Sequence, residues 1–173
     1  MCMLPMTRSA RPSTPTLVSS TIIAALIAVS LGCSGPEMPA DVSTRVESLE
    51  RTAVVDRSDS VLHYYESGEH SASLDVVLGA PESPTPIGAA RIWKSESMDP
   101  EGAYGSWRLS IEFENDSGGW DRAAYAVHGT NHPELLEEPA PRFFSNGCIR
   151  LENDEILWLA DRLEEGDSVF VVP

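Results

Sequence analysis

Lysine is almost missing from this sequence, since Lys94 is the only one among 173 residues. Any mechanism that needs two lysines is therefore excluded. Basic residues are few as well, and the formal net charge is −15. Beyond residue 33, ten basic residues stand against 27 acidic ones, which leaves a net charge near −17. A surface that acidic repels phosphate backbones, so nucleic acid is not expected as a partner, and the charge favours solubility.

Long hydrophobic runs are also absent. The longest apolar stretch, residues 16–31, is shorter than the roughly 20 residues that a membrane-spanning helix needs. It follows a start that contains Arg8 and Arg11 but no acid, and it ends at the small residue Gly32. This order is typical of a secretory signal. We expect residues 1–33 to be a signal peptide and the rest of the chain to lie outside the cytoplasm.

The end of this leader resembles the cleavage site of a bacterial lipoprotein. Leu31-Gly32-Cys33 fits that site, although Ser30 stands where leucine is usual. We expect a lipid on Cys33 that contacts the membrane, and a location in the periplasm or cell envelope. Ser34 rather than aspartate follows, so the outer membrane is favoured over the inner one. A secretory peptide cut elsewhere and an uncleaved anchor remain open.

Cysteine is scarce, with three in the chain. Cys2 lies in the leader and Cys33 at its end, which leaves Cys148 as the one thiol of the mature domain. In an oxidising compartment such a thiol has no disulfide partner within its chain. A buried, inert cysteine is one interpretation, and a reactive one is the other.

The segment 34–57 is polar and contains two prolines. We interpret it mainly as a tether, in which Val42, Val46 and Leu49 fall at helical spacing and allow a short amphipathic helix. The domain proper is expected over residues 58–173.

Short runs rich in β-formers, separated by turns, make up residues 58–173. The clearest spans residues 107–114, where apolar and polar residues alternate as in a half-buried strand. Further strands are expected at 61–65, 71–79, 89–94, 123–128, 149–151 and 168–172. One helix is expected, with Asn153 as its N-cap and Gly166 as its end. The predicted fold is mainly β, a sandwich or mixed sheet with one clear helix near the C-terminus.

Two glycine-containing polar elements flank the long loop 130–147. The first contains His128-Gly129 and the second Gly147-Cys148. A thiol attacks an acyl carbon as the thiolate, and its ordinary pKa is ~8.5. A nearby histidine can take the proton and return it to a leaving amine. A glycine before the cysteine permits a tight turn whose amides face a developing oxyanion.

These elements resemble the L,D-transpeptidase catalytic domain family of the YkuD type. The pattern is His128-Gly129, then the loop, then the run Ser145-Asn146-Gly147-Cys148-Ile149-Arg150-Leu151. Residues 77–81 and 85–88 are similar to the family's Gly-x-Pro and Thr-Pro-x-Gly stretch. The resemblance covers roughly residues 60–173, and the cysteine run is its specific part.

The resemblance implies a role for each matched residue. Cys148 would be the nucleophile, His128 the general base and acid, and the Gly129 carbonyl would orient the imidazole. The backbone amides of Asn146, Gly147 and Cys148 would form the oxyanion hole. One departure is Asn146, which stands where the family commonly has histidine and which cannot titrate.

The resemblance also implies a substrate, namely peptidoglycan stem peptides that react through a thioester on the cysteine. Ser145, Arg150 and Tyr125 are candidates for binding it. The acyl acceptor could be a second stem, an envelope protein or water, so an L,D-carboxypeptidase or endopeptidase stays open. No cofactor and no metal are implied.

Three alternative interpretations of these residues have less support in the sequence. A zinc site of His128, His132 and Cys148 would need both histidines on one face, and Gly129 and Pro133 argue against a helix between them. A papain-type protease would place cysteine before histidine. A lipoprotein that binds peptidoglycan without turnover would not need the histidine–cysteine pair.

Overall fold

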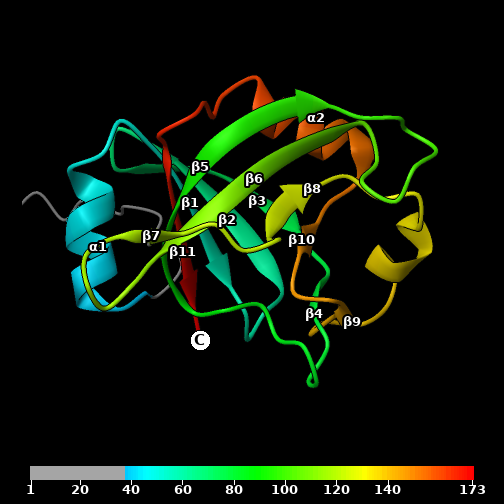
Figure 1. Cartoon of the computed structure of the whole chain (residues 1–173), viewed down its shortest axis with the longest axis horizontal. Helices are drawn as coiled ribbons and strands as arrows, with labels where there is room; N and C mark the ends of the chain where they lie inside the picture. The colour runs from blue at the N-terminus through cyan, green and yellow to red at the C-terminus, as the bar shows by residue number, and fades with distance from the viewer. Residues whose placement is uncertain (1–37) are drawn as a thin grey trace, which may run out of the picture. The chain divides into compact units, whose positions relative to one another are not determined.

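The computed structural model describes residues 38–173 (Figure 1). The expected signal peptide and the expected lipid site at Cys33 lie outside the described residues. The helices are α1 (Ala40–Glu47), the 3-10 helix η1 (Pro133–Leu136) and α2 (Asn153–Ala160). The strands are β1 (Arg51–Asp56), β2 (Val61–Glu66), β3 (Glu69–Asp75), β4 (Leu78–Gly79), β5 (Gly88–Ser97), β6 (Trp107–Glu114), β7 (Trp120–Asp121), β8 (Ala126–His128), β9 (Phe143–Ser145), β10 (Ile149–Arg150) and β11 (Ser168–Val172).

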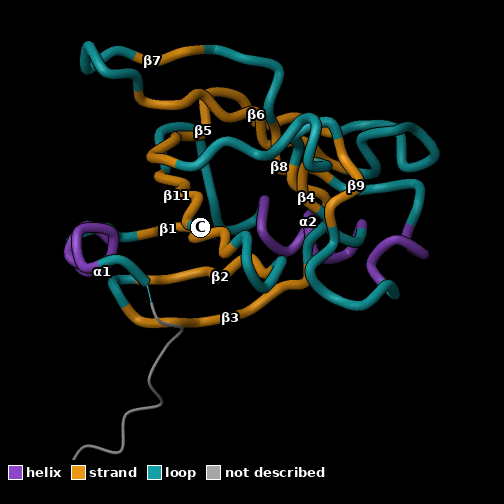
Figure 2. Tube along the Cα trace, turned by 90° about the horizontal axis from the view of Figure 1, so that it is seen from below, coloured by secondary structure: helices purple, strands orange, loops and turns teal. Residues whose placement is uncertain are grey.

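One mixed sheet dominates the domain, with the strand order β10-β8-β6-β5-β11-β1-β2-β3 and β7 paired to β6. The pairs β1–β11 and β8–β10 are parallel and the other neighbours are antiparallel. The sheet curls, as Figure 2 shows, so that β3 and β8 lie on opposite arms of an arc. The prediction of a mainly β fold with a mixed sheet is confirmed.

The main core fills the concave side of this arc, where α2 packs (Figure 2). Ile156, Leu159 and Leu163 come from α2 and the turn after it, and each is at most 2% exposed. They meet the inward residues of the strands, among them Leu109 and Val127. Burial of a side chain of this size contributes roughly 1.5–3 kcal/mol, so these contacts hold α2 firmly against the sheet.

Helix α1 covers the other side of the sheet. Val46 packs with Val54, Tyr65 and Phe170 in a second, smaller core. The expected tether over 34–57 therefore needs a correction. Strand β1 is a central strand, paired to both β2 and β11, and the ordered fold begins well before residue 58. The sequence feature that indicates this strand is the apolar run within β1, in which four of the six residues are buried.

The C-terminal helix is present but shorter than expected. It ends at Ala160, and Gly166, with φ 101°, lies in a later turn. Its N-cap is Glu152 rather than Asn153, because Glu152 and Glu155 form a reciprocal capping box. Asn153 is consequently free for another contact, described below.

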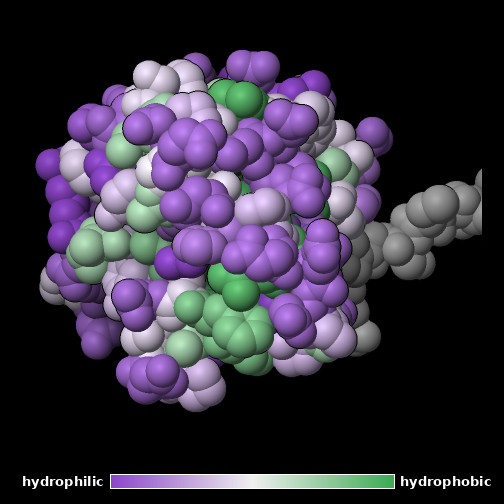
Figure 3. Space-filling model, turned by 90° about the vertical axis from the view of Figure 1, so that its right-hand side faces the viewer, coloured by the Kyte–Doolittle hydropathy of each residue, from purple (hydrophilic) through white to green (hydrophobic). Residues whose placement is uncertain are grey.

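No helix among residues 38–173 is long and apolar enough to cross a membrane. Figure 3 views the side of the domain that carries η1. This side is mostly hydrophilic, with one gathered hydrophobic patch near its lower edge. The loop that joins the two predicted catalytic elements therefore faces solvent along much of its length.

Candidate active site

Two short parallel strands bring the predicted nucleophile and base together. In the β8–β10 pair, Ile149 lies opposite Val127 and Arg150 lies opposite His128. Val127 and Ile149 point into the core, with 1% and 0% exposure. Since side chains alternate along a strand, His128, Arg150 and the adjacent Cys148 stand on the opposite side of the sheet.

We call this side the catalytic face. It consists of outward residues of β6 and β8, of Cys148 just before β10 and of Arg150 at the end of β10. These residues are Arg108, Ser110, Ala126, His128, Cys148 and Arg150. Antiparallel pairing of β6 with β8 sets Arg108 beside His128 and Ser110 beside Ala126. The predicted nucleophile and base are therefore diagonal neighbours on adjacent strands, although 20 positions separate them in the sequence.

Cys148 is half-buried, and its sulfur contacts the backbone of the strand beside it. The Sγ–H donates to the Ala124 carbonyl at 3.7 Å. Burial raises the pKa of the Cys148 thiol above its ordinary value, whereas a hydrogen bond from the Ala126 backbone and the charges of Arg150 and Arg108 lower it. The resting group is a thiol, held in surroundings that stabilise the thiolate once it forms.

His128 is 2% exposed and is oriented by backbone carbonyls. Its Nδ1 lies 2.5 Å from the Gly129 oxygen, which can only accept, so Nδ1 carries the proton and Nε2 is the basic nitrogen of the neutral ring. The expected contact with Gly129 is thus present. Burial lowers the His128 pKa from 6.5 to about 4. The Gly129 and Tyr104 carbonyls act in the opposite direction, because they favour the protonated ring and raise the pKa.

The loop between β5 and β6 closes over this histidine. The Tyr104 ring packs edge-on against the imidazole, with centroids 5.0 Å apart. Gly105 and Gly129 lie so close that a Cβ on Gly105 would sit 2.5 Å from the Gly129 carbonyl carbon. The Asn153 Oδ1 accepts the Ser106 amide at 2.8 Å in the same junction. Asn153 therefore ties the loop to the start of α2 and to the turn that holds the histidine.

The turn before the nucleophile is braced by Ser145. This residue is 1% exposed, its Oγ donates to the Cys148 carbonyl at 2.6 Å, and the Gly147 amide donates to the same Oγ at 3.1 Å. Ser145 thus braces the turn, and its contact with substrate stays a prediction. The Gly147 amide is engaged within the turn. The amides of Asn146 and Cys148 remain predictions for the oxyanion hole.

Gly147 is required by the packing of Tyr125. Its φ of 102° lies in the left-handed region, and an added Cβ would meet Tyr125 Cε1 at 2.6 Å. The Tyr125 ring in turn packs edge-on against Phe113, 5.7 Å away. Tyr125 thus supports the nucleophile turn and also faces the small cavity described below.

Sequence reasoning missed two contributors to this site. Arg108 lies beside His128, and Tyr104 covers it. A signal for Arg108 existed in the alternation of residues 107–114, which already placed it opposite the core. No local pattern marks Tyr104, because its position depends on the close approach of Gly105 and Gly129.

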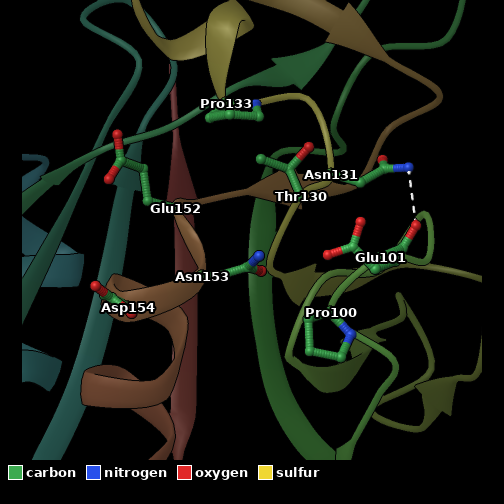
Figure 4. Close-up of a pocket in the computed structure, with 8 residues that line it drawn as sticks. All are labelled: Pro100, Glu101, Thr130, Asn131, Pro133, Glu152, Asn153 and Asp154. Atoms are coloured by element: carbon green, nitrogen blue, oxygen red, sulfur yellow. Dashed lines mark hydrogen bonds between the residues drawn. The ribbon is translucent and has the colours of Figure 1, made fainter.

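Two cavities lie close to the histidine, although His128 itself lines neither of them. The smaller, of about 110 Å³, opens on the catalytic face and is lined by Trp93, Tyr104, Arg108, Ser110 and residues 123–126. The larger, of about 350 Å³, lies beyond Thr130 and is shown in Figure 4. It is lined by Pro100, Glu101, Thr130, Asn131, Pro133, Glu152, Asn153 and Asp154, and the Asn131 amide donates to the Glu101 carbonyl. The smaller cavity is the one next to the chemistry, because it includes Ala124 and Ala126, whose backbones contact the sulfur.

His132 is separated from the site. It is exposed and pairs with Glu134 at 2.9 Å, while His128 is buried. Within residues 38–173, no group of three or more potential metal-ligating side chains comes together. The geometry thus pairs Cys148 with His128 and leaves His132 in the loop.

Comparisons with known proteins agree with this arrangement. Residues 50–171 match the family model YkuD, the L,D-transpeptidase catalytic domain. The Bacillus licheniformis protein YkuD is 24% identical over 155 residues, which are 86% of each chain. The Bacillus subtilis protein YqjB is 41% identical over 56 residues, 32% of this chain and 30% of that protein.

Solved structures share the fold. An L,D-transpeptidase from Mycobacterium smegmatis matches with a TM-score of 0.53 and 21% identity, over 72% of this chain and 59% of that one. L,D-transpeptidase 3 from Mycobacterium tuberculosis matches with a TM-score of 0.55 and 18% identity, over 72% and 61%. The chain thus spans less than two thirds of these longer proteins. The family match covers more than half of the chain and includes both His128 and Cys148, so the chain belongs to the L,D-transpeptidase catalytic domain family.

Proposed function

We propose that this protein is a cysteine-dependent L,D-transpeptidase that acts on peptidoglycan stem peptides. The observation that carries the proposal is the pairing of β8 and β10, which places Cys148 and His128 as diagonal neighbours on one face. The family match supports the class of reaction. The donor is a stem tetrapeptide in which a terminal D-residue follows the L-centre of a diamino acid.

The first half-reaction forms a thioester. His128 takes the proton of Cys148 on Nε2, and the sulfur attacks the carbonyl carbon of the diamino acid. The C–N bond to the D-residue breaks, the imidazolium returns the proton to the departing amine, and the D-amino acid leaves. The Gly129 and Tyr104 carbonyls, which favour the protonated ring, stabilise His128 while it holds that proton. The thiol must first leave its contact with the Ala124 carbonyl.

The second half-reaction transfers the acyl group to an acceptor. An amine of a second stem gives a cross-link, an amine of an envelope protein gives an attachment, and water gives hydrolysis. We favour the stem amine. The solvent-facing loop 130–147 lies between the two catalytic elements and contains three exposed acids, which are suited to a cationic amine.

We further propose that the protein works in the cell envelope, held there by a lipid on Cys33. The leader sequence supports this location, as does a substrate that lies outside the cytoplasm. Replacement of the residue, Cys33→Ser, should release the protein from membranes and abolish lipid labelling. An unchanged membrane fraction would favour an uncleaved anchor instead.

The reaction is tested with purified sacculi. Incubation with the enzyme, digestion and mass analysis should reveal new dimers joined between two diamino acids, and Cys148→Ala should abolish them. The same substitution should prevent acylation by a carbapenem in intact-mass measurements. Tripeptides alone would identify a hydrolase, and adduct formation on Cys148→Ala would contradict the assigned nucleophile.

A further inference from the structure

Basic side chains gather around the nucleophile of this acidic protein. Five of the ten basic residues beyond residue 33 stand on the catalytic face or on the strand and loop next to it. They are Arg91, Lys94, Arg108, Arg122 and Arg150. Only two carboxylates are paired among them, since Glu112 binds Arg91 and Arg122, and Glu96 binds Lys94 and Arg108. The region around Cys148 is therefore positive within a chain of net charge −15, which suits an anionic group on the substrate.

Arg108 is the basic residue closest to the chemistry on the cavity side. Strand pairing places it directly beside His128. Its Nη2 donates to Glu96 at 2.5 Å, and its guanidinium lies 5.0 Å from the centroid of the Tyr104 ring. Its Nε is buried and has no hydrogen-bond partner among the described residues. Since Glu96 is shared with Lys94, Arg108 keeps both charge and a donor for a further partner.

The cavity of about 110 Å³ that Arg108 lines has the size of one small amino acid. At about 30 Å³ per water, it would hold roughly four waters. Ala124 and Ala126 form one wall, and their backbones contact the sulfur. Tyr104, which packs on His128, forms another. Neither Cys148 nor His128 lines the cavity itself, but a group in it would contact residues that touch each of them.

We infer that Arg108 binds the terminal carboxylate of the D-residue that leaves in the first half-reaction, with that residue seated in this cavity. The inference rests on the proposed function. His128 must reach the departing amine, and amine and carboxylate are bonded to the same carbon. The carboxylate therefore lies close to His128, and Arg108 stands directly beside His128 and lines the cavity. Arg108 has the planar fork that suits a carboxylate.

The other nearby cation fits this role less well. Arg150 also neighbours His128, but it stands on the opposite side, on β10, and it does not line the cavity. The second carboxylate of a diamino acid stays on the acyl side of the broken bond and remains in the thioester. A cavity on the leaving-group side binds the terminal carboxylate of the D-residue instead. By binding this carboxylate, Arg108 makes the enzyme specific for stem peptides with a free C-terminal end.

The test compares two synthetic stem tetrapeptides, one ending in a free carboxylate and one in a carboxamide. Release of the D-residue or its amide gives kcat/KM for thioester formation, and reaction of the thiol with a carbapenem confirms an active nucleophile. The wild-type protein should prefer the acid by about 10- to 100-fold, as expected for a charged hydrogen bond. Arg108→Met should reduce this preference to about threefold or less, because the acid loses its carboxylate partner whereas the amide loses only the effect of the Arg108 charge on the thiolate. Arg108→Lys should retain part of it.

Lys94→Met is the matched control, because Lys94 shares Glu96 with Arg108 but does not line the cavity. It should keep the full preference. Equal turnover of acid and amide by the wild-type protein, or an unchanged preference in Arg108→Met, would overturn the inference and leave the proposed function standing. A protein that acylates with the carbapenem but cleaves neither tetrapeptide would overturn the proposed function and the inference with it.

Discussion

Gly105 lies where the loop over His128 meets the turn that orients it, and Gly105→Ala tests this junction. The native φ is +59°, which disfavours an L-residue by about 1–2 kcal/mol. The new Cβ would lie 2.1 Å from the Asn153 Oδ1 and 2.5 Å from both the Gly129 carbonyl carbon and the Thr130 nitrogen. The last two are backbone atoms and cannot rotate away, so overpacking adds about 1–3 kcal/mol. We expect a loss of roughly 2–5 kcal/mol in the free energy of unfolding.

The same substitution should impair catalysis. Ordinary contacts begin at 3.4 Å, so about 0.9 Å of overlap must be relieved by the backbone that carries the Gly129 carbonyl. That carbonyl fixes Nδ1 of His128. A displacement near 1 Å at a reacting group can lower the rate about 10²-fold, and we expect a loss of that order in acylation by a carbapenem.

Gly118→Ala provides the control. Its φ is +76°, but no atom lies within 4 Å of the added Cβ, so only the left-handed conformation is disfavoured. Urea unfolding and intact-mass acylation rates, measured side by side, separate the two effects. If Gly105→Ala were no less stable than Gly118→Ala and acylated at the wild-type rate, the close approach of loop and turn would not position His128.

Three further predictions concern the two catalytic side chains. His128→Ala should lower the acylation rate by about 10²–10⁴, whereas His132→Ala in the exposed loop should change it little; the reverse ranking would show that the base is misassigned. In the unfolded state the imidazole of residue 128 takes up a proton near pH 6.5, whereas buried His128 does so only near pH 4. The free energy of unfolding should therefore fall by about 3 kcal/mol as the pH is lowered from 6.5 to 4, and urea unfolding of His128→Gln should lack this part of the pH dependence. Because burial raises the pKa of Cys148, its alkylation by iodoacetamide should be slow at pH 7 and accelerate with rising pH, and a flat profile would indicate a preformed thiolate.

The sequence predicted the parts of this molecule that are locally encoded. Alternation identified β6, and the two glycine-containing elements predicted His128 and Cys148 as the catalytic pair, which pairing of β8 with β10 brings together. The first strand was missed because a polar, proline-containing segment precedes it, and its burial depends on β2 and β11. Asn153 was misassigned as an N-cap because its actual partner, the Ser106 amide, lies 47 positions away. Contacts of that range leave no local pattern.

The electrostatics of the pair point to proton transfer during attack rather than before it. Burial raises the pKa of the thiol and lowers that of the imidazole to about 4, so both favour the neutral forms at rest. Arg108 and Arg150 stabilise the Cys148 thiolate but destabilise the His128 imidazolium. Their two effects oppose each other, so they do not favour a preformed thiolate–imidazolium ion pair. What they do favour is negative charge on the face where the oxyanion develops. The neutral resting thiol remains unreactive toward solvent electrophiles, and a bound acyl group that accepts the sulfur's electron pair makes the proton transfer favourable.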